Sequence, residues 1–371
     1  MPYFDHSATT PIHPIVLHKM NSISEAHFGN PSSIHSSGRK SKAIIESSRR
    51  IIADLIHAAP NEIIFTGSGT EANNAVLWSL IFEQNKHVIT SSVEHPAILK
   101  VLDSIAPFGV TYTKLPVNKF GEVNPTELEK AIQKNTGLIS IMMVNNEVGT
   151  INPINSLIQV SKSKNIPFHS DSVQALGKTP LSVNDLGADY LSFSGHKFYG
   201  PKGVGFLYKK NESKLNPIII GGGQESQLRA GTENISGIVG LAEAVRLAVQ
   251  NLDSRIIHLE ELEAKFKSSL SNYCPNVIYN GHPEKHVPGV ISASFLNKKS
   301  DILLAELDRE GIEVSSGSAC GSGSVKPSFV LEEMGLSESQ NISTIRISFG
   351  RSNTMADVNT LVNALAKYTN V

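Results

Sequence analysis

The chain has 371 residues, of which 40% are hydrophobic and 18% charged, so it has the composition of a globular protein and the length of about two domains. Its formal net charge of −1 argues against a bulk electrostatic attraction to nucleic acid or to a membrane surface, and no apolar run approaches the roughly 18 residues that span a bilayer. The two cysteines, Cys274 and Cys320, form no CxxC pair, which argues against a disulfide scaffold and a structural zinc site.

Residues 1–6 contain neither the basic region nor the apolar core of a secretory signal peptide. Since the sparse cysteines also fit a reducing compartment, we expect a cytoplasmic protein. We expect no bound metal.

A polar, turn-rich segment over 5–11 is followed by a helix over 38–57, whose isoleucine and leucine side chains form one stripe. Short apolar runs then alternate with helical patterns. Strands are expected over 62–66, 87–91, 110–115, 137–144, 167–171, 189–194 and 203–208. Helices are expected over 70–82, 95–106, 124–134 and 154–164. This alternation predicts an α/β fold with a mostly parallel sheet, of the seven-stranded type, between layers of helices.

The pattern changes after about residue 235. A long apolar helix near 236–252 precedes a second helix around 259–270. Beyond them, a smaller α+β unit is indicated by strand-like and helix-like stretches over 290–295, 301–310, 345–349 and 355–367. We therefore expect a large domain over 15–250 and a small domain over 251–371, with the N-terminal segment 1–14 packed against the small domain.

One lysine, Lys197, follows a short apolar strand and lies among small hydroxyl residues just before a Gly/Pro turn. A partly desolvated amine loses its proton more easily, as a Schiff-base lysine must. Ser194 and His196 beside it could donate hydrogen bonds to a phosphate. A solvated loop lysine explains this segment alone equally well.

Residues 65–72 read as a strand, a glycine turn and a helix start, which together make an anion site from free backbone N–H groups. Gly69 and Thr70 lie at the start of this helix. The same pattern fits the G-x-G-x-x-A dinucleotide fingerprint, and Glu94 stands near the expected ribose-binding acid. A nicotinamide-dependent dehydrogenase is therefore an alternative, as is a plain strand-to-helix turn.

Several polar residues follow predicted strands, at the edge where ligands gather in an open parallel sheet. Asp171 could keep a pyridine nitrogen protonated, which makes the ring an electron sink, or could cap a helix. Gln174 could donate to a phenolic oxygen of that ring. His95 could stack on a flat cofactor or cap the next helix. Asn146 could hold a substrate carboxylate or an oxygen of the cofactor ring, or could form a polar turn.

The loop over 314–324 places Cys320 among small residues, a setting that favours a reactive, exposed thiol, whereas Cys274 is interpreted as structural. Arg346 lies on an otherwise apolar strand and needs a partner, either a substrate carboxylate or an internal ion pair. Thr232 belongs to a glycine-rich segment over 221–234 that could reach an anion across a dimer interface, or could be a plain linker.

Ten motifs occur in a specific order: D-x-x-A-T-T-P at 5–11, F-G-N-P-S-S-x-H at 28–35, T-G-x-G-T-E-x-N at 66–73, E-H-P at 94–96, N-N-E-x-G at 145–149, D-x-x-Q at 171–174, S-x-H-K-x-x-G-P-K-G at 194–203, R-x-G-T-E-N at 229–234, S-G-S-A-C at 316–320 and I-R-x-S at 345–348. With this set, nearly the whole chain resembles the cysteine desulfurases of the NifS/IscS type. These are class V aminotransferase-like enzymes with the type I fold of pyridoxal 5'-phosphate (PLP) enzymes.

The resemblance implies a role for each candidate residue. Lys197 would hold PLP covalently, and the phosphate contacts would come from Gly69, Thr70, Ser194 and His196, with Thr232 contributed by a partner subunit. The ring contacts would come from His95 by stacking, Asp171 at the pyridinium and Gln174 at the phenolic oxygen. Asn146 and Arg346 would hold the substrate carboxylate, and Cys320 would become the persulfide.

The implied reaction converts L-cysteine to L-alanine and passes the persulfide sulfur to an acceptor protein for iron–sulfur cluster assembly or tRNA thiolation. The resemblance also implies a homodimer. Gly195 stands where many relatives have alanine, and glycine and serine follow Cys320, so the preferred acceptor stays open. A selenocysteine lyase or another class V enzyme would share the lysine and the aspartate, and a non-catalytic scaffold would have lost activity despite keeping them.

Overall fold

The computed structural model describes residues 2–316 and 326–369. A seven-stranded sheet forms its centre, in the order β1-β7-β6-β5-β4-β2-β3. The strands are β1 (Ile63–Thr66), β2 (His87–Ser91), β3 (Thr111–Leu115), β4 (Thr136–Ser140), β5 (Phe168–Asp171), β6 (Tyr190–Ser194) and β7 (Gly205–Lys209). The neighbouring strands β3, β2, β4, β5 and β6 run parallel to one another, and β7 lies antiparallel to its neighbours β1 and β6. The predicted mostly parallel sheet is confirmed.

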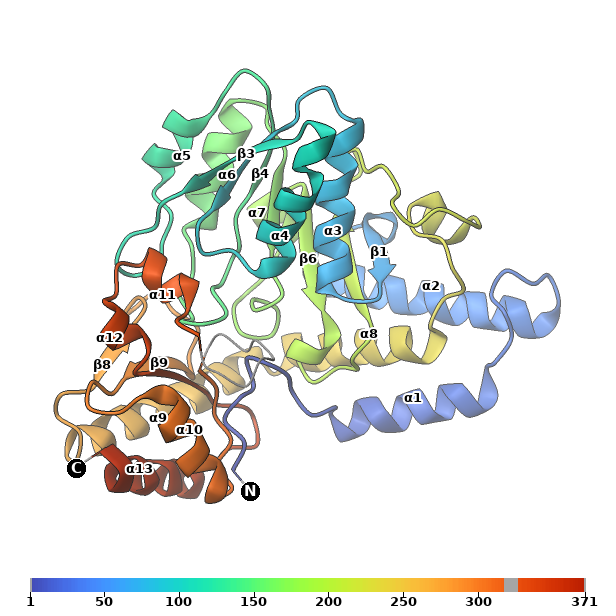
Figure 1. Cartoon of the computed structure of the whole chain (residues 1–371). Helices are drawn as coiled ribbons and strands as arrows, with labels where there is room; N and C mark the ends of the chain where they lie inside the picture. The colour runs from blue at the N-terminus through green and yellow to red at the C-terminus, as the bar shows by residue number, and fades with distance from the viewer. Residues whose placement is uncertain (1, 317–325, 370–371) are drawn as a thin grey trace.

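Helices cover both faces of this sheet (Figure 1). They are α1 (Pro14–Ala26), α2 (Ser36–Ile56), α3 (Gly69–Ser79), α4 (Pro96–Ile105), α5 (Pro125–Ala131), α6 (Ile154–Ser163), α7 (Val183–Leu186) and α8 (Ile235–Gln250). Short 3-10 turns are η1 (Pro60–Glu62), η2 (Leu80–Phe82), η3 (Ala106–Phe108), η4 (Gly195–Lys197) and η5 (Gln224–Gln227). The helix α1, which the sequence did not predict, packs with α2 on α8.

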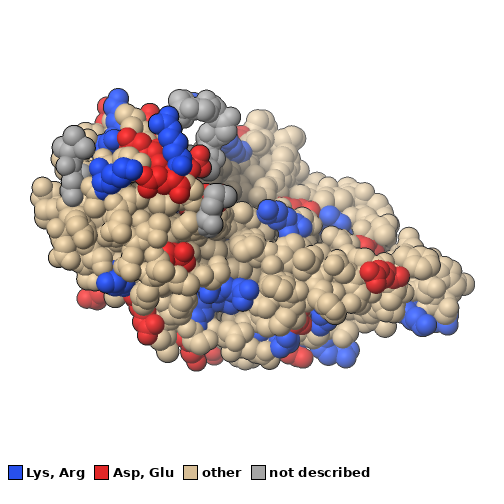
Figure 2. All heavy atoms as spheres, turned by 90° about the horizontal axis from the view of Figure 1, so that it is seen from below, with Lys and Arg blue, Asp and Glu red and all other residues tan. Residues whose placement is uncertain are grey.

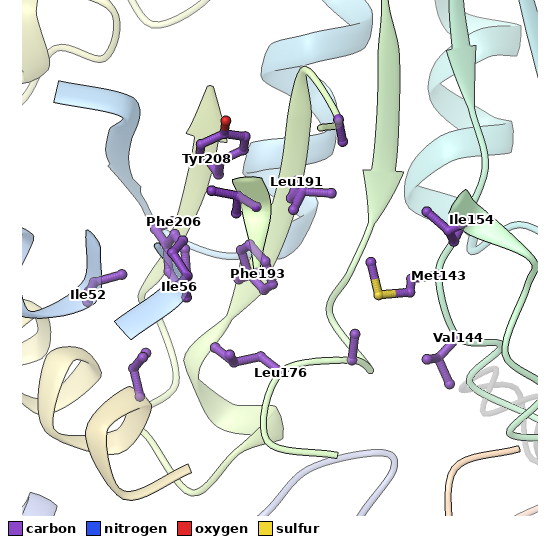
Figure 3. Close-up of a cluster of buried hydrophobic side chains, with 14 of the residues drawn as sticks. Ile52, Ile56, Met143, Val144, Ile154, Leu176, Leu191, Phe193, Phe206 and Tyr208 are labelled. Carbon is purple, nitrogen blue, oxygen red and sulfur yellow. The ribbon is translucent and has the colours of Figure 1, made fainter. Parts of the chain in front are cut away.

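Alternation along β7 explains how one strand serves two cores. Leu207 points to the cluster under α3 and α4, whereas Phe206 and Tyr208 point to the larger cluster on the other face. In Figure 3 the side chains that β6 and β7 contribute to this larger cluster lie beside Ile52 and Ile56 of α2. Because both faces are buried, the strand register is fixed by the packing of these side chains.

A smaller unit follows α8. It contains an antiparallel sheet in the order β10-β9-β8, and its helices surround a separate apolar cluster. Its elements are α9 (Leu252–Ser271), β8 (Ile278–Asn280), β9 (Val290–Ser294), α10 (Ser300–Arg309), α11 (Phe329–Glu333), α12 (Glu338–Asn341), β10 (Thr344–Ser348) and α13 (Met355–Thr369). Phe4 from the N-terminal segment lies in this second cluster. The predicted smaller α+β unit is confirmed.

Two predicted boundaries were wrong. The strand expected over 137–144 ends at Ser140, because the Met142 N–H donates to the buried Glu94 carboxylate at 2.8 Å and its carbonyl accepts from the Asn152 side chain at 2.9 Å. The helix expected to run to about residue 134 ends at Ala131. Both differences leave the order of the elements unchanged.

Among the described residues, no single helix is both long and apolar enough to cross a membrane. Only α8 and α9 taken together pass that test, and they are bent by 68° at their junction. On the face in Figure 2, lysine and arginine side chains are interspersed with aspartate and glutamate.

Candidate active site

The amine of Lys197 lies at the carboxyl edge of the sheet, because η4 directly follows β6. Its Nζ donates to the backbone carbonyls of Ser7 and Ala8, at 2.9 and 2.6 Å. Burial, reinforced by the charge of Arg346, lowers the pKa of Lys197 to about 8. Lys197 therefore has the partly desolvated amine that a Schiff-base lysine needs. The alternative of a solvated loop lysine is wrong.

Asp171 ends β5, next to β6, and its carboxylate is held from two sides. Asn73 Nδ2 of α3 donates to Oδ2 at 2.7 Å, and the Val173 N–H donates to Oδ1 at 3.1 Å. Asn73 is 1% exposed, so its amide is fixed by packing. The sequence interpretation missed Asn73 as a functional residue, although it is the last position of the motif over 66–73.

His95 follows β2 and takes up the cap position of α4, where its Nδ1 accepts from the Ala97 N–H at 3.1 Å. Burial lowers the pKa of His95, and the charges of Asp171 and Lys197 act on it in opposite directions. The ring lies within electrostatic reach of both residues. The helix-capping alternative is correct, and it leaves the ring face available to a cofactor.

The start of α3 forms a glycine-built cradle. A Cβ on Gly69 would lie 2.4 Å from Val173 Cγ2 and 3.3 Å from Ser194 Cβ, so only glycine fits between β6 and the turn after β5. Thr70, the next residue, is exposed with its backbone N–H in the first turn of the helix. Helix N-termini with free N–H groups bind phosphate.

His196 lies at the same edge, where its Nδ1 pairs with Thr9 Oγ1 at 3.1 Å. Burial, together with the nearby Lys197 and Lys202, lowers the pKa of His196 to about 4, so the ring is neutral at pH 7. A neutral imidazole retains one N–H donor for an anion.

Arg346 lies on β10, and only 4% of its surface is exposed. The sequence predicted either an internal ion pair or a substrate carboxylate as its partner. Its Nη2 donates to Asp5 Oδ1 at 2.7 Å, and its Nη1 donates to the backbone carbonyl of Asn146 at 2.9 Å. Its Nε is buried without a partner in the described residues. The internal ion pair thus exists, and one donor remains for a ligand. The sequence interpretation missed Asp5 in this role.

Glu94, the acid of the dinucleotide alternative, is fully buried. It accepts from Ser91 Oγ at 2.7 Å and from the Met142 N–H, and burial raises its pKa to about 8. This side chain is bonded inward and cannot reach a ribose. The nicotinamide-dependent dehydrogenase alternative therefore lacks the ribose-binding acid that it requires.

The remaining predicted residues differ in how closely they are tied to this site. Gln174 is buried, and its Nε2 donates to the Ser7 carbonyl at 2.9 Å. Thr232 is exposed on the segment before α8, and within the described residues no hydrogen bond joins it to the other site residues. Cys320 lies outside the described residues.

The chain on either side of residues 317–325 is attached near Arg346. Ser315 and Arg346 exchange two backbone hydrogen bonds, at 3.1 and 2.6 Å. On the far side, Ser328 Oγ donates to Glu147, which follows Asn146, at 2.5 Å. Both flanks of the segment that contains Cys320 are therefore attached beside the proposed carboxylate-binding residues.

The residues gathered here fit PLP. The amine of Lys197 suits its aldehyde, the carboxylate of Asp171 suits its ring nitrogen, and the cradle at Gly69 suits its phosphate. An open, mostly parallel sheet with these groups at its carboxyl edge defines a PLP-dependent enzyme of the aminotransferase type.

Comparison with known proteins gives the same class. The aminotransferase class-V family profile matches residues 2–361. The chain is 43% identical to a cysteine desulfurase IscS of Dictyoglomus turgidum, covering 98% of this chain and 93% of that protein. It is 41% identical to a cysteine desulfurase IscS of Methanosarcina thermophila, covering 98% and 90%. The chain therefore belongs to the class-V aminotransferase family, in the group of the cysteine desulfurases.

Solved structures support this assignment. A structure described as a NifS-like protein superposes with a TM-score of 0.93 at 36% identity, covering 99% of this chain and 98% of the other. The structure of SspA in complex with cysteine gives a TM-score of 0.84, also at 36% identity, covering 94% and 99%. The predicted family, fold class and PLP cofactor are confirmed.

Proposed function

We propose that the protein takes sulfur from L-cysteine, releases L-alanine and carries the sulfur as a persulfide on Cys320. The observation that supports this most is the desolvated amine of Lys197, whose pKa is lowered to about 8 and which lies at the same edge as Asp171. A structural lysine has no need of that environment, whereas a lysine that binds an aldehyde does.

Each of the chain's own groups then has a task. Lys197 would hold PLP, Asp171 would pair with its ring nitrogen in the orientation set by Asn73, and His95 would cover its ring. The phosphate would be held by Gly69, Thr70, Ser194 and His196. When bound, PLP supplies an electron sink for the substrate's α-carbon.

Arg346 and Asn146 would hold the carboxylate of L-cysteine. Nε of Arg346 is buried and unpartnered in the described residues, which leaves a charge-assisted donor for that carboxylate. Lys197 Nζ would take a proton from the substrate α-carbon and return it later. A base with a pKa of about 8 suits a proton transfer near neutral pH.

The thiolate of Cys320 would attack the substrate sulfur. A sulfur–sulfur bond forms, the substrate's carbon–sulfur bond breaks, and the electron pair of that bond remains with the three-carbon fragment, which takes up protons and leaves as alanine. The described residues on either side of the segment that contains Cys320 support this assignment, because Ser315 bonds to Arg346 and Ser328 bonds to Glu147, the neighbour of Asn146.

We further propose that the protein works as a homodimer in which Thr232 contacts the cofactor of the partner. Exposed large apolar side chains support this. Phe28 is 85%, Ile34 90% and Ile220 85% exposed, and exposed apolar side chains of this size are typical of interaction surfaces. Ile220 and Thr232 belong to the same segment, between β7 and α8.

The finer assignments follow the same proposal. The acceptor would be an iron–sulfur scaffold protein or a tRNA-thiolating enzyme, and the compartment would be the cytoplasm. We place the boundary between the large and small domains at Asn251, where α8 and α9 meet at 68°, and we assign the N-terminal segment to the small domain because Phe4 lies in its core.

One experiment tests the proposed function directly. The purified protein, loaded with PLP, is given either L-cysteine or L-selenocysteine, and alanine is quantified with the cofactor absorbance recorded in parallel. We expect a visible cofactor band and alanine release from cysteine. A protein that releases alanine from selenocysteine alone is a selenocysteine lyase, and a protein without a cofactor band contradicts the proposal.

A further inference from the structure

The side-chain amide of Gln174 has its orientation fixed from both ends. Its Nε2 donates to the Ser7 carbonyl at 2.9 Å, and its Oε1 accepts from Lys178 Nζ. A carbonyl can only accept and an ammonium can only donate, so the two partners allow one orientation of the amide. Reversing the amide would set donor against donor and acceptor against acceptor.

Within the described residues, this orientation leaves one N–H of Gln174 without a hydrogen-bond partner. An amide nitrogen carries two hydrogens, and only one is taken by Ser7. The same Ser7 carbonyl accepts from Lys197 Nζ at 2.9 Å, so Gln174 and Lys197 meet at a single oxygen. The free N–H therefore lies beside the amine that holds the cofactor.

We propose that Lys178 is a positioning residue of the cofactor site, which holds Gln174 so that an N–H rather than the carbonyl oxygen faces the phenolic oxygen of PLP. This inference rests on the proposed function, since it assumes that PLP occupies the site. A phenolic oxygen that bears negative charge is stabilised by a donor and destabilised by an acceptor. By orienting the amide of Gln174, Lys178 determines that the phenolic oxygen faces a donor and not an acceptor.

The surroundings of Lys178 fit this task better than an ion-pair role. Lys178 lines a small cavity of about 20 Å³ together with His6, Lys197 and Arg255, and no carboxylate is among the described residues that line it. Burial, with the charges of Lys197, Arg346 and Arg255, lowers the pKa of Lys178 to about 7. A half-buried amine that has no acid partner among the described residues is costly, and the hydrogen bond to Gln174 offsets part of this cost.

The neutral amine keeps N–H donors and also has a lone pair, and the Ser7 carbonyl, which can only accept, then still keeps Nε2 on its side. Gln174 itself is 6% exposed, so water does not readily replace Lys178 as its partner. The two residues are four positions apart in the turn after β5, which keeps the pair local and the amide close to Asp171.

The test uses K178M, which keeps the apolar stem and removes the donor, in a double-mutant cycle with Q174A. K178R keeps a donor, and K130M on the exposed Lys130 of α5 is the matched surface control. Three quantities are measured for each PLP-loaded protein: the cofactor absorption band at fixed pH, kcat with KM for L-cysteine, and the affinity of the apoprotein for PLP alone.

We expect K178M to shift the cofactor band and to lower kcat about tenfold with little change in KM, as loss of one oriented hydrogen bond would. The double variant should be no worse than Q174A alone, K178R should recover most of the loss, and K130M should match the wild type. An unchanged band in K178M, or losses that multiply in the double variant, would overturn the inference.

If K178M does not fold, Q174E provides the second test. Its carboxylate pairs with Lys178 and offers the cofactor no N–H, so it should reproduce the spectral shift in a folded protein. A wild-type band in Q174E would overturn the inference. Failure of the proposed function is distinguishable, because the wild type itself would then lack the cofactor band or alanine release.

Discussion

Asp5 and Arg346 form a 2.7 Å ion pair between residues 341 positions apart in the sequence, and it attaches the N-terminal segment to β10 beside the active site. The side chains of Asp5 and Arg346 are 21% and 5% exposed. The carboxylate of Asp5 is thus already present at the guanidinium that we assign to the substrate carboxylate. The carboxylate of a bound substrate must therefore share the guanidinium of Arg346 with the carboxylate of Asp5.

The variant D5N should bind L-cysteine more tightly. Asparagine keeps an oxygen acceptor for Nη2 and removes the negative charge that competes with the substrate. We expect KM to fall about two- to fivefold with kcat nearly unchanged, the size of effect expected for one partly exposed charge.

Steady-state kinetics of D5N against E313Q check this, because Glu313 is an exposed acid in an isolated bridge with Tyr3 of the same N-terminal segment, and within the described residues no ion pair joins it to Arg346. A tenfold rise in KM would show instead that the full ion pair is needed to orient the guanidinium.

The variant K197A should lose covalent attachment of PLP. Without the amine no Schiff base forms, so the visible band of the purified protein should disappear and alanine release should fall at least a thousandfold. Absorption spectra after gel filtration measure the attachment. Lys210→Ala, on the half-exposed Lys210 after β7, should retain the band, and a normal spectrum in K197A would assign the cofactor to another amine.

The cradle at α3 should be intolerant of a side chain. A Cβ on Gly69 would approach Val173 Cγ2 to 2.4 Å, so G69A must displace the turn that follows Asp171. We expect the affinity for PLP to fall at least tenfold and the free energy of unfolding to fall by about 1–3 kcal/mol. PLP titration of the apoprotein and thermal melts measure both effects. Gly223, which has nothing within 4 Å of its added Cβ, gives the control G223A.

The sequence could predict residues whose position follows from strand order. His95, Asp171 and Lys197 each follow a strand, and parallel strands bring their carboxyl ends to one edge of the sheet. Knowing that each element exists was therefore enough to group the three side chains. The helix start at Gly69 joins them by the same rule.

The orienting contacts could not be predicted in that way. Asn73 reaches Asp171 over 98 positions and Gln174 reaches Ser7 over 167, and no periodicity or spacing rule links such pairs. The end of β4 at Ser140 was missed for a related reason. Just beyond Ser140, the backbone N–H and carbonyl of Met142 bond to the side chains of Glu94 and Asn152, whereas the apolar composition of residues 141–144 predicts more strand.

The rate at which the apoprotein captures PLP should depend on the pKa of Lys197. Only the neutral amine attacks an aldehyde, and burial with Arg346 places the pKa near 8 rather than at its usual 10.5. The neutral fraction is then about a tenth at pH 7 and about a hundredth at pH 6. The capture rate should rise tenfold per pH unit up to about 8 and then level off.

Stopped-flow absorbance over pH 6–10 measures this profile. Removing Arg346 takes away a positive charge that lowers the pKa, so R346M should move the midpoint upward while PLP's own titrations stay the same. A wild-type rate that keeps rising to pH 10 would mean that Lys197 is not desolvated. An unchanged midpoint in R346M would mean that Arg346 does not act on it.

The two cysteines should differ completely in their importance. C320A should keep the cofactor band, because Lys197 and the phosphate cradle are untouched, yet it should form no enzyme persulfide and release alanine from L-cysteine at under about 1% of the wild-type rate. Cys274 is buried, and its Sγ lies 2.9 Å from Thr369 Oγ1 in the small unit, so C274A is the matched control. C274A should retain full turnover with at most a modest loss of stability. Persulfide labelling and alanine assays on both variants decide the matter, and turnover retained in C320A would remove this thiol from the mechanism.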